Sequence, residues 1–323
     1  MVLSIVLLLV GFVLLIVGAV KLVDGASSVS RNFNIPNIVI GLTIVAFGTS
    51  APELVVNVLS SLEGHTGLVM GNVVGSNIFN VCGILGVCAL FAPLTVQRKT
   101  TWLEIPFNIL TALMLLVLCA DIYENNANEN ILTRGDGIIL LGFFVIFLVY
   151  NINLAASNKD EVDDADILDV KRGNGISILL IIIGLVGLVI GGKLIVDNAV
   201  QIASAFGLSE RIVGLTIVSI GTSLPELATS IAAVRKGKLD IAVGNVIGSN
   251  IFNISFVLGI SATICSVPVP NSSFFDLFFN LAISILLFAF VLIRRKKGLQ
   301  KLEAIFFLSI YLAYTAYLVM GNN

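Results

Sequence analysis

The sequence Gly-Thr-Ser-x-Pro-Glu occurs twice, once from Gly48 to Glu53 and again from Gly221 to Glu226. Each copy follows a strongly apolar run, where a carboxylate is costly unless it faces a cavity, a partner or an ion. No lysine or arginine lies deep within any apolar run, so the sequence offers these glutamates no buried salt bridge. Glu53 and Glu226 are therefore the first candidates for binding a cation.

The residues around both glutamates supply further oxygen atoms. Pro52 and Pro225 have no N–H, so the carbonyl four residues before each loses its helical partner and the helix is predicted to break. Such a break is tolerated at membrane depth only beside protein or a water-filled cavity. The hydroxyls predicted beside the glutamates belong to Thr49, Ser50, Thr222 and Ser223. Carbonyl, hydroxyl and carboxylate oxygens together favour a hard cation, and a divalent ion would offset the repulsion between two carboxylates.

A second duplicated motif lies about twenty residues further on. Nine of ten positions are identical between 71–80 and 244–253, and both copies carry a polar side chain at every fourth position. Such stripes often serve as packing contacts between membrane helices. Because they accompany two otherwise unpaired glutamates, we expect a role in or beside the ion site for Ser76, Asn80, Ser249 and Asn253.

Composition indicates a membrane protein. The chain is 57% hydrophobic and 12% charged, with a mean hydropathy of +1.05, which excludes an ordinary soluble globule. Apolar stretches of about 20 residues recur along it, the length that crosses a hydrocarbon core. The fold class predicted is an all-α polytopic membrane protein with ten transmembrane helices, at roughly 2–22, 36–62, 67–92, 102–120, 134–154, 174–196, 209–234, 241–266, 274–293 and 302–320.

An acidic connector divides these spans into five and five. The sequence therefore predicts a first repeat over 1–156, a cytoplasmic linker over 157–173 and a second repeat over 174–323. Segments 35–54 and 208–227 share eleven of twenty residues without gaps, which supports duplication. Because each repeat has an odd number of spans, the second copy enters the membrane inverted. Loops assigned to one side carry fifteen basic residues and those on the other carry three, which predicts both termini outside.

At these motifs the chain resembles the cation/calcium exchanger superfamily, and within it the prokaryotic sodium/calcium exchangers. The resemblance implies that Glu53 and Glu226 bridge a calcium site, with help from the carbonyls of Thr49 and Thr222. It implies flanking sodium sites formed by two further sets of residues. One set is the Ala46 carbonyl, Thr49, Ser50 and Ser76, and the other is the Ser219 carbonyl, Thr222, Ser223 and Ser249, with Asn80 and Asn253 at the remaining corners.

One departure from the family pattern bears on the coupling ions. Some archaeal and potassium-dependent members carry an acid at the position of Asn253, whereas this chain has an amide. The site would then hold two formal negative charges rather than three, which argues against potassium co-transport.

These features favour a secondary antiporter that exchanges Na⁺ for Ca²⁺ across the cell membrane by alternating access and normally exports calcium. We expect no enzymatic activity, no cofactor beyond the transported ions, contact with membrane lipid, and no nucleic-acid or protein partner. A proton/calcium exchanger is the nearest alternative, since protons would also neutralise Glu53 and Glu226. A passive cation channel would reveal itself by single-channel currents, and an intramembrane acid protease by cleavage that is lost in Glu53→Gln.

Overall fold

A computed structural model describes residues 2–32, 46–94, 96, 100–121, 129–157, 173–235, 237, 239–294 and 298–320. Helices form nearly all of it. The first half contains α1 (Val2–Asn32), α3 (Ala46–Thr49), α4 (Ala51–Glu63), α5 (Thr66–Ile78), η2 (Phe79–Ile84), α6 (Leu85–Phe91), η3 (Thr100–Glu104), α7 (Ile105–Leu118), β1 (Ile131–Leu132) and α9 (Arg134–Ser157). The second half contains α10 (Asn174–Phe206), α11 (Glu210–Val213), η4 (Gly214–Val218), α12 (Ser219–Thr222), α13 (Leu224–Arg235), α14 (Leu239–Phe252), η5 (Asn253–Leu258), α15 (Gly259–Ile264), β2 (Val267–Pro268), α16 (Asn271–Arg294) and α17 (Lys301–Met320). The η elements are π-helical.

The membrane spans agree closely with the apolar stretches. Within the described residues, eight helices are long and apolar enough to cross a membrane, and the bent pair 210–222 and 224–235 makes a ninth. The remaining expected span, 36–62, is described only from Ala46 onward. Two helices are longer than hydropathy predicted, because α1 continues to Asn32 and α10 to Phe206. Hydropathy marks the part of a helix that lipid covers, and these helices continue beyond it.

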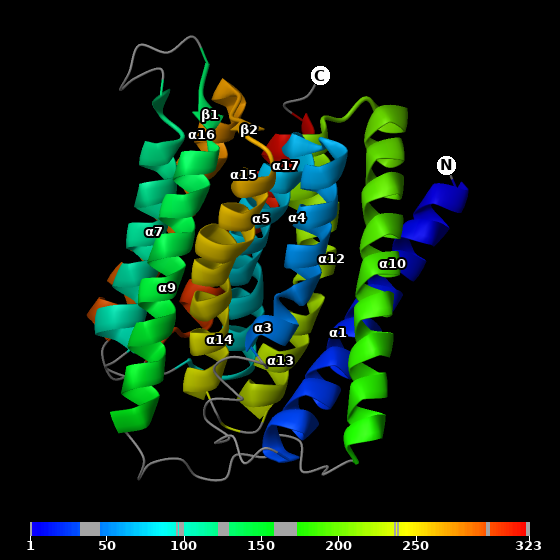
Figure 1. Cartoon of the computed structure of the whole chain (residues 1–323). Coiled ribbons are helices and arrows are strands. Elements are labelled where there is room, and N and C mark those ends of the chain that lie inside the picture. The colour runs from blue at the N-terminus through cyan, green and yellow to red at the C-terminus, as the bar shows by residue number, and fades with distance from the viewer. Residues whose placement is uncertain are drawn as a thin grey trace.

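The helices run up and down one bundle (Figure 1). The start of α1 and the end of α17 lie toward one end, whereas α9 ends and α10 begins at the other. At the end nearer the termini, β1 and β2 form a two-residue antiparallel pair that the all-helical prediction did not include. Because only two residue pairs are involved, this pairing joins two loops and leaves the fold class helical.

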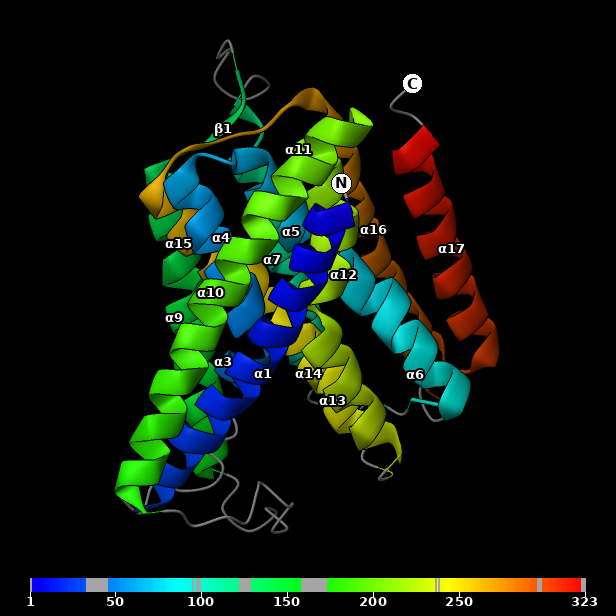
Figure 2. The ribbon, with the colours of Figure 1, turned by 90° about the vertical axis from the view of Figure 1, so that its right-hand side faces the viewer.

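The first helix of each half packs against the other along small residues. Figure 2 shows α1 and α10 side by side, running in opposite directions. The facing residues are Gly11 with Gly191, Gly18 with Gly184, and Gly25 with Ser177. A Cβ atom added at Gly18 would lie 2.8 Å from the Gly184 carbonyl oxygen. This close backbone approach explains the seven-residue glycine spacing on both helices.

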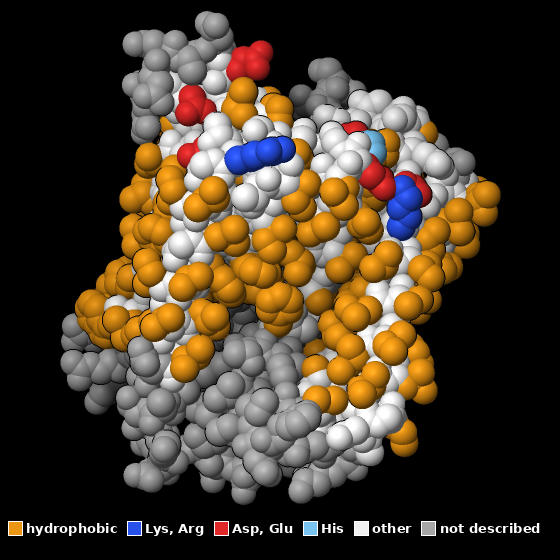
Figure 3. All heavy atoms as spheres, in the orientation of Figure 1, with side chains coloured by type: hydrophobic (Ala, Val, Ile, Leu, Met, Phe, Trp, Pro, Cys, Tyr) orange, Lys and Arg blue, Asp and Glu red, His pale blue; other side chains and the backbone are white. Residues whose placement is uncertain are grey.

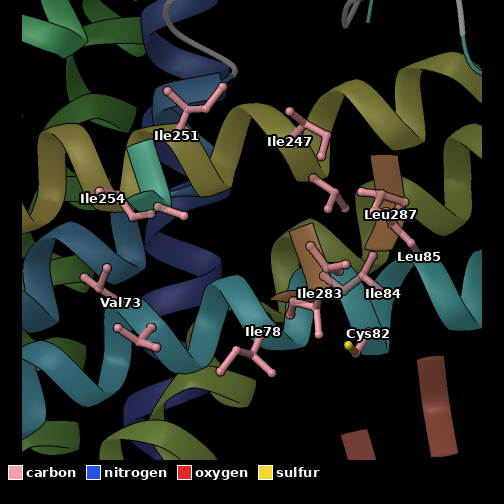
Figure 4. Packing of buried hydrophobic residues seen from close by; sticks show 14 of the residues in the cluster. Val73, Ile78, Cys82, Ile84, Leu85, Ile247, Ile251, Ile254, Ile283 and Leu287 are labelled. Carbon is pink, nitrogen blue, oxygen red and sulfur yellow. The ribbon is translucent and has the colours of Figure 1, made fainter. Parts of the chain in front are cut away.

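The main apolar core fills the space between the helices of the second duplicated motif (α5, η2, α14 and η5) and the last two helices, α16 and α17. Figure 4 shows isoleucines of α14 and η5 packed toward η2 and α16, with Cys82 among them. Cys82, Cys88 and Cys119 are buried and Cys265 is partly buried, and all four are free thiols. They fill space within the bundle, as their apolar sequence surroundings predict.

On the face shown in Figure 3, apolar side chains cover the described middle of the bundle, and the coloured charged side chains lie near the end that holds the termini. There Lys193 of α10 pairs with Glu63, the last residue of α4, and with Asp197. Deeper in the protein, Arg211 pairs with Asp276, which is 1% exposed and also accepts a hydrogen bond from Tyr314 at 2.9 Å. This buried pair ties α11 to α16 and α17.

Candidate ion-binding site

Both Gly-Thr-Ser-x-Pro-Glu segments are broken helices, as the prolines predict. In the first half Ser50 separates α3 from α4, and in the second Ser223 separates α12 from α13 with a bend of 44°. The two serines have nearly the same backbone conformation, with φ −91° and ψ 8° at Ser50 and φ −85° and ψ 8° at Ser223. Each break starts a new helix with a glutamate in its first turn, where the helix dipole favours negative charge.

The two segments meet through reciprocal hydrogen bonds. Ser223 Oγ donates to Glu53 Oε1 at 2.9 Å, and Ser50 Oγ donates to Glu226 Oε1 at 3.0 Å. Each glutamate is 1% exposed. Within the described part of the chain, neither carboxylate pairs with a basic side chain. The structure thus brings the two acids of the duplicated motif to one buried place and leaves their charges without a cationic partner there.

Within the part of the chain that the structure describes, the second carboxylate oxygen of each glutamate has no hydrogen-bond partner. Among the described residues, the buried atoms without a hydrogen-bond partner include Oε2 of Glu53 and of Glu226, together with Oδ1 of Asn80 and of Asn253. Leaving a buried acceptor unpaired costs about 1–3 kcal/mol, and more when the group is charged. Four such atoms at duplicated positions are two carboxylate and two amide oxygens, the ligand types that hard cations prefer.

Further hydroxyls line the same region. Ser249 Oγ lies 3.3 Å from Ser50 Oγ and 3.5 Å from Glu226 Oε1. In the other half, Ser76 Oγ lies 3.5 Å from the carbonyl oxygen of Ser219, the residue that begins α12. Ser50, Ser223 and Ser249 thus lie beside the glutamates, and the Ser219 carbonyl is contacted by Ser76.

Thr222 belongs to a buried polar chain. Its hydroxyl donates to Asn72 Oδ1 at 3.1 Å, and Asn72 donates to Asn57 Oδ1 at 2.7 Å. In the second half the corresponding Asn245 donates to Ser230 Oγ at 3.2 Å. These contacts hold the polar face of α5 against α4 and the polar face of α14 against α13. They explain Asn72 and Asn245 as supports of the broken helices.

Asn80 and Asn253 lie where α5 and α14 give way to π-helical turns, in η2 and at the start of η5. Each follows a serine of the site by one turn, Ser76 or Ser249. Insertions of this type inside α-helices are frequent at functional sites, because they redirect side chains locally.

The two remaining predicted residues lie at the ends of α3. Thr49 ends α3 directly before Ser50, and its side chain hydrogen-bonds with Glu226, whereas Ala46 begins α3 at the point where the described chain resumes. Sequence reasoning did not single out Asn77 and Asn250, which hold the amides of Asn253 and Asn80. The signal was present, because both lie in the motif that is identical at nine of ten positions.

Soft-metal ligands do not gather around the glutamates in the described part of the chain. Among the described residues, no group of three or more His, Cys, Asp or Glu side chains is placed to hold a metal ion. The single histidine, His65, instead pairs with Glu210 through Nδ1 at 2.9 Å. The candidate site therefore consists of two carboxylates and neutral oxygens.

Helices of membrane length, together with two helix breaks that bring buried glutamates beside buried serine hydroxyls, define a polytopic membrane protein. Known proteins agree. The chain belongs to the sodium/calcium exchanger family, whose model, described as "Sodium/calcium exchanger protein", matches residues 3–153 and 176–320. It is a family of transporters rather than enzymes.

Several prokaryotic relatives match along most of their length. Inner membrane protein YrbG of Escherichia coli (strain K12) is 38% identical over 270 residues, which cover 82% of this chain and 81% of that protein. The sodium/calcium exchanger MaX1 of Methanosarcina acetivorans is 30% identical over 326 residues, covering 89% and 91%. A solved structure of the sodium–calcium exchanger NCX_Mj, soaked with 100 mM Na⁺ and 10 mM Sr²⁺, superposes with a TM-score of 0.66 at 31% identity, covering 98% of both chains.

Proposed function

We propose that this protein is a Na⁺/Ca²⁺ antiporter whose transported ions bind between Glu53 and Glu226. The observation that carries the proposal is a set of four buried oxygens, two from glutamates and two from asparagines, for which the described residues supply no donor. A Ca²⁺ ion would offset both carboxylate charges and satisfy all four atoms. Ser50, Ser223 and Ser249, with the carbonyl of Ser219, supply the neutral oxygens that suit Na⁺.

Obligatory exchange follows from the cost of burying charge. With no ion bound, two carboxylates in a closed site would lack a compensating charge, and such burial is strongly unfavourable. Occupancy by Ca²⁺ or by several Na⁺ removes that penalty, so only loaded states change access. The close glycine-lined contact of α1 with α10 supports a mechanism in which these two helices move together, as one unit, against the rest of the bundle.

The proposal includes an orientation in the membrane. The halves 1–156 and 174–323 are inverted repeats, joined by a cytoplasmic linker over 157–173, in a cell membrane with both termini outside. Reciprocal contacts between corresponding residues, such as Ser50 with Glu226 and Ser223 with Glu53, support the repeat. The excess of basic residues on one set of loops supports the orientation. Cysteine-accessibility labelling from each side of right-side-out vesicles tests it.

Na⁺ is proposed as the coupling ion, and K⁺ is not required because Asn253 contributes no third charge. The names of relatives such as the sodium/calcium exchanger MaX1 support this choice. With both gradients oriented physiologically, Na⁺ entering down its gradient would export Ca²⁺.

The test is ⁴⁵Ca²⁺ uptake into proteoliposomes of the purified protein, with Na⁺, K⁺ and H⁺ gradients imposed separately. We expect an outward Na⁺ gradient to drive uptake without K⁺, and Glu53→Gln to abolish it. Uptake driven only by a pH gradient would instead establish a proton/calcium exchanger. Uptake that needs no counter-ion and carries single-channel current would establish a channel.

A further inference from the structure

We propose that Asn77 and Asn250 are positioning residues that turn the amide oxygens of Asn253 and Asn80 toward the bound cation, each acting from the opposite half of the chain. The inference rests on the proposed function and deepens it, because it names residues that prepare the site without touching the ion.

Four hydrogen bonds connect an asparagine pair of the first half with the corresponding pair of the second half. Asn77 Oδ1 accepts from Asn253 Nδ2 at 3.2 Å, and Asn250 Oδ1 accepts from Asn80 Nδ2 at 2.9 Å. Asn77 Nδ2 donates to the backbone carbonyl of Asn250 at 3.1 Å, and Asn250 Nδ2 donates to that of Asn77 at 3.3 Å. All four asparagines are at most 1% exposed, so water does not replace these contacts.

The backbone carbonyls fix the direction of the whole network. A carbonyl oxygen only accepts, so Asn77 and Asn250 must each present Nδ2 to it. Their Oδ1 atoms are then left to face Asn253 and Asn80, which must in turn present Nδ2. The remaining atom of each of these two amides is Oδ1, the same atom that has no partner among the described residues. The network thus leaves two amide oxygens, and no N–H groups, available to a cation.

This orientation matters because an amide is nearly symmetric in shape. Turned by half a rotation, Asn80 or Asn253 would occupy the same volume but direct a positively polarised NH₂ group at the cation. Ligands held by neighbouring hydrogen bonds lose affinity when those neighbours are removed, typically about 10- to 100-fold. Because these bonds join the two halves, separating α5 from α14 would release the amides of Asn80 and Asn253 at once.

An aspartate at the ligand position gives a specific test, because both of its terminal atoms are oxygens and its orientation is irrelevant. The substitution Asn77→Ala is introduced into three backgrounds, namely the wild type, Asn253→Asp and Asn80→Asp. Binding of ⁴⁵Ca²⁺ to each purified protein in Na⁺-free buffer is compared with and without the substitution. We expect a loss of about 10- to 100-fold in the wild type and in Asn80→Asp. In Asn253→Asp we expect a change below about threefold, since the positioned amide is gone.

The reciprocal experiment replaces Asn250 instead of Asn77, and the two aspartate backgrounds should exchange their results. Asn250→Ala should lose affinity in the wild type and in Asn253→Asp, but not in Asn80→Asp. Asn108→Ala is the matched control, since Asn108 is buried in α7, donates to Ser284 Oγ at 3.2 Å outside this network, and should leave affinity unchanged. Size-exclusion profiles and thermal unfolding report whether each variant is folded. Should Asn77→Ala not fold, the Asn250→Ala series and Asn77→Ser carry the test.

Equal losses in all three backgrounds would overturn the positioning role and assign Asn77 and Asn250 to packing alone. Unchanged affinity in Asn77→Ala or Asn250→Ala would overturn it as well. These results leave the proposed function intact if the wild type binds Ca²⁺ and Glu53→Gln does not. Absence of Ca²⁺ binding by the wild type would overturn both proposals.

Discussion

Replacing Glu53 by glutamine removes one of the two charges on which the ion site depends while preserving the shape of the side chain. Glu53 Oε1 is held by Ser223 at 2.9 Å, whereas Oε2 has no partner among the described residues. An amide keeps an acceptor for Ser223 but then directs NH₂ at the ion. We therefore expect a folded protein that binds Ca²⁺ weakly.

The magnitude follows from breaking a buried charge interaction. Removing one partner of such a pair costs about 3–5 kcal/mol, which at about 1.4 kcal/mol per factor of ten lowers Ca²⁺ affinity roughly 100- to 4,000-fold. Glu226 lies in a matching environment, held by Ser50 at 3.0 Å, so Glu226→Gln should fall in the same range.

Stability should move in the opposite direction when ions are absent. In chelator without Na⁺, the wild type buries two uncompensated carboxylates and the variant only one, so Glu53→Gln should unfold at an equal or higher temperature. Added Ca²⁺ should stabilise the wild type far more than the variant, because a ligand stabilises the folded state in proportion to how tightly it binds.

The matched control is Glu63→Gln, the same substitution at the end of the same helix, where the side chain pairs with Lys193 outside the site. It should bind Ca²⁺ as the wild type does. Wild-type affinity in Glu53→Gln, or an equal loss in Glu63→Gln, would refute this reasoning about the site.

Two further predictions concern the bundle. Gly18→Leu should lower the unfolding temperature, because its Cβ would lie 2.8 Å from the Gly184 carbonyl oxygen and push α1 away from α10. Gly142→Leu is the control, since no atom lies within 4 Å of a Cβ added there, and its unfolding temperature should not fall. Equal effects of the two substitutions would contradict close packing of α1 against α10. Arg211→Met should destabilise the protein by about 3–5 kcal/mol by leaving Asp276 buried without its partner. Adding Asp276→Asn should restore most of that loss in denaturant unfolding, and no restoration would show that the pair is not the cause.

The sequence predicted the broken helices because their cause is local. Pro52 and Pro225 remove backbone donors wherever they occur in a helix, and the breaks fall at Ser50 and Ser223, two residues before each proline. The meeting of the two glutamates was also predictable, since equivalent positions of a duplicated chain are expected to occupy related places in the fold.

Partners across the fold were less accessible from sequence. The polar stripe indicated Asn80 and Asn253, but only the packing of α5 against η5 and α14 shows that Asn77 and Asn250 hold them. Likewise, hydropathy located the spans but ended α1 and α10 early, because it reports contact with lipid rather than helix continuation.

The most direct test of the account is the location of bound Ca²⁺, measured by anomalous X-ray diffraction from crystals grown in Ca²⁺ without Na⁺. We expect one peak at about 2.3–2.6 Å from Oε2 of both Glu53 and Glu226, the usual Ca²⁺–oxygen distance. A peak that contacts only one of these carboxylates, or that lies elsewhere in the bundle, would contradict the claim that the two duplicated acids bind a shared ion.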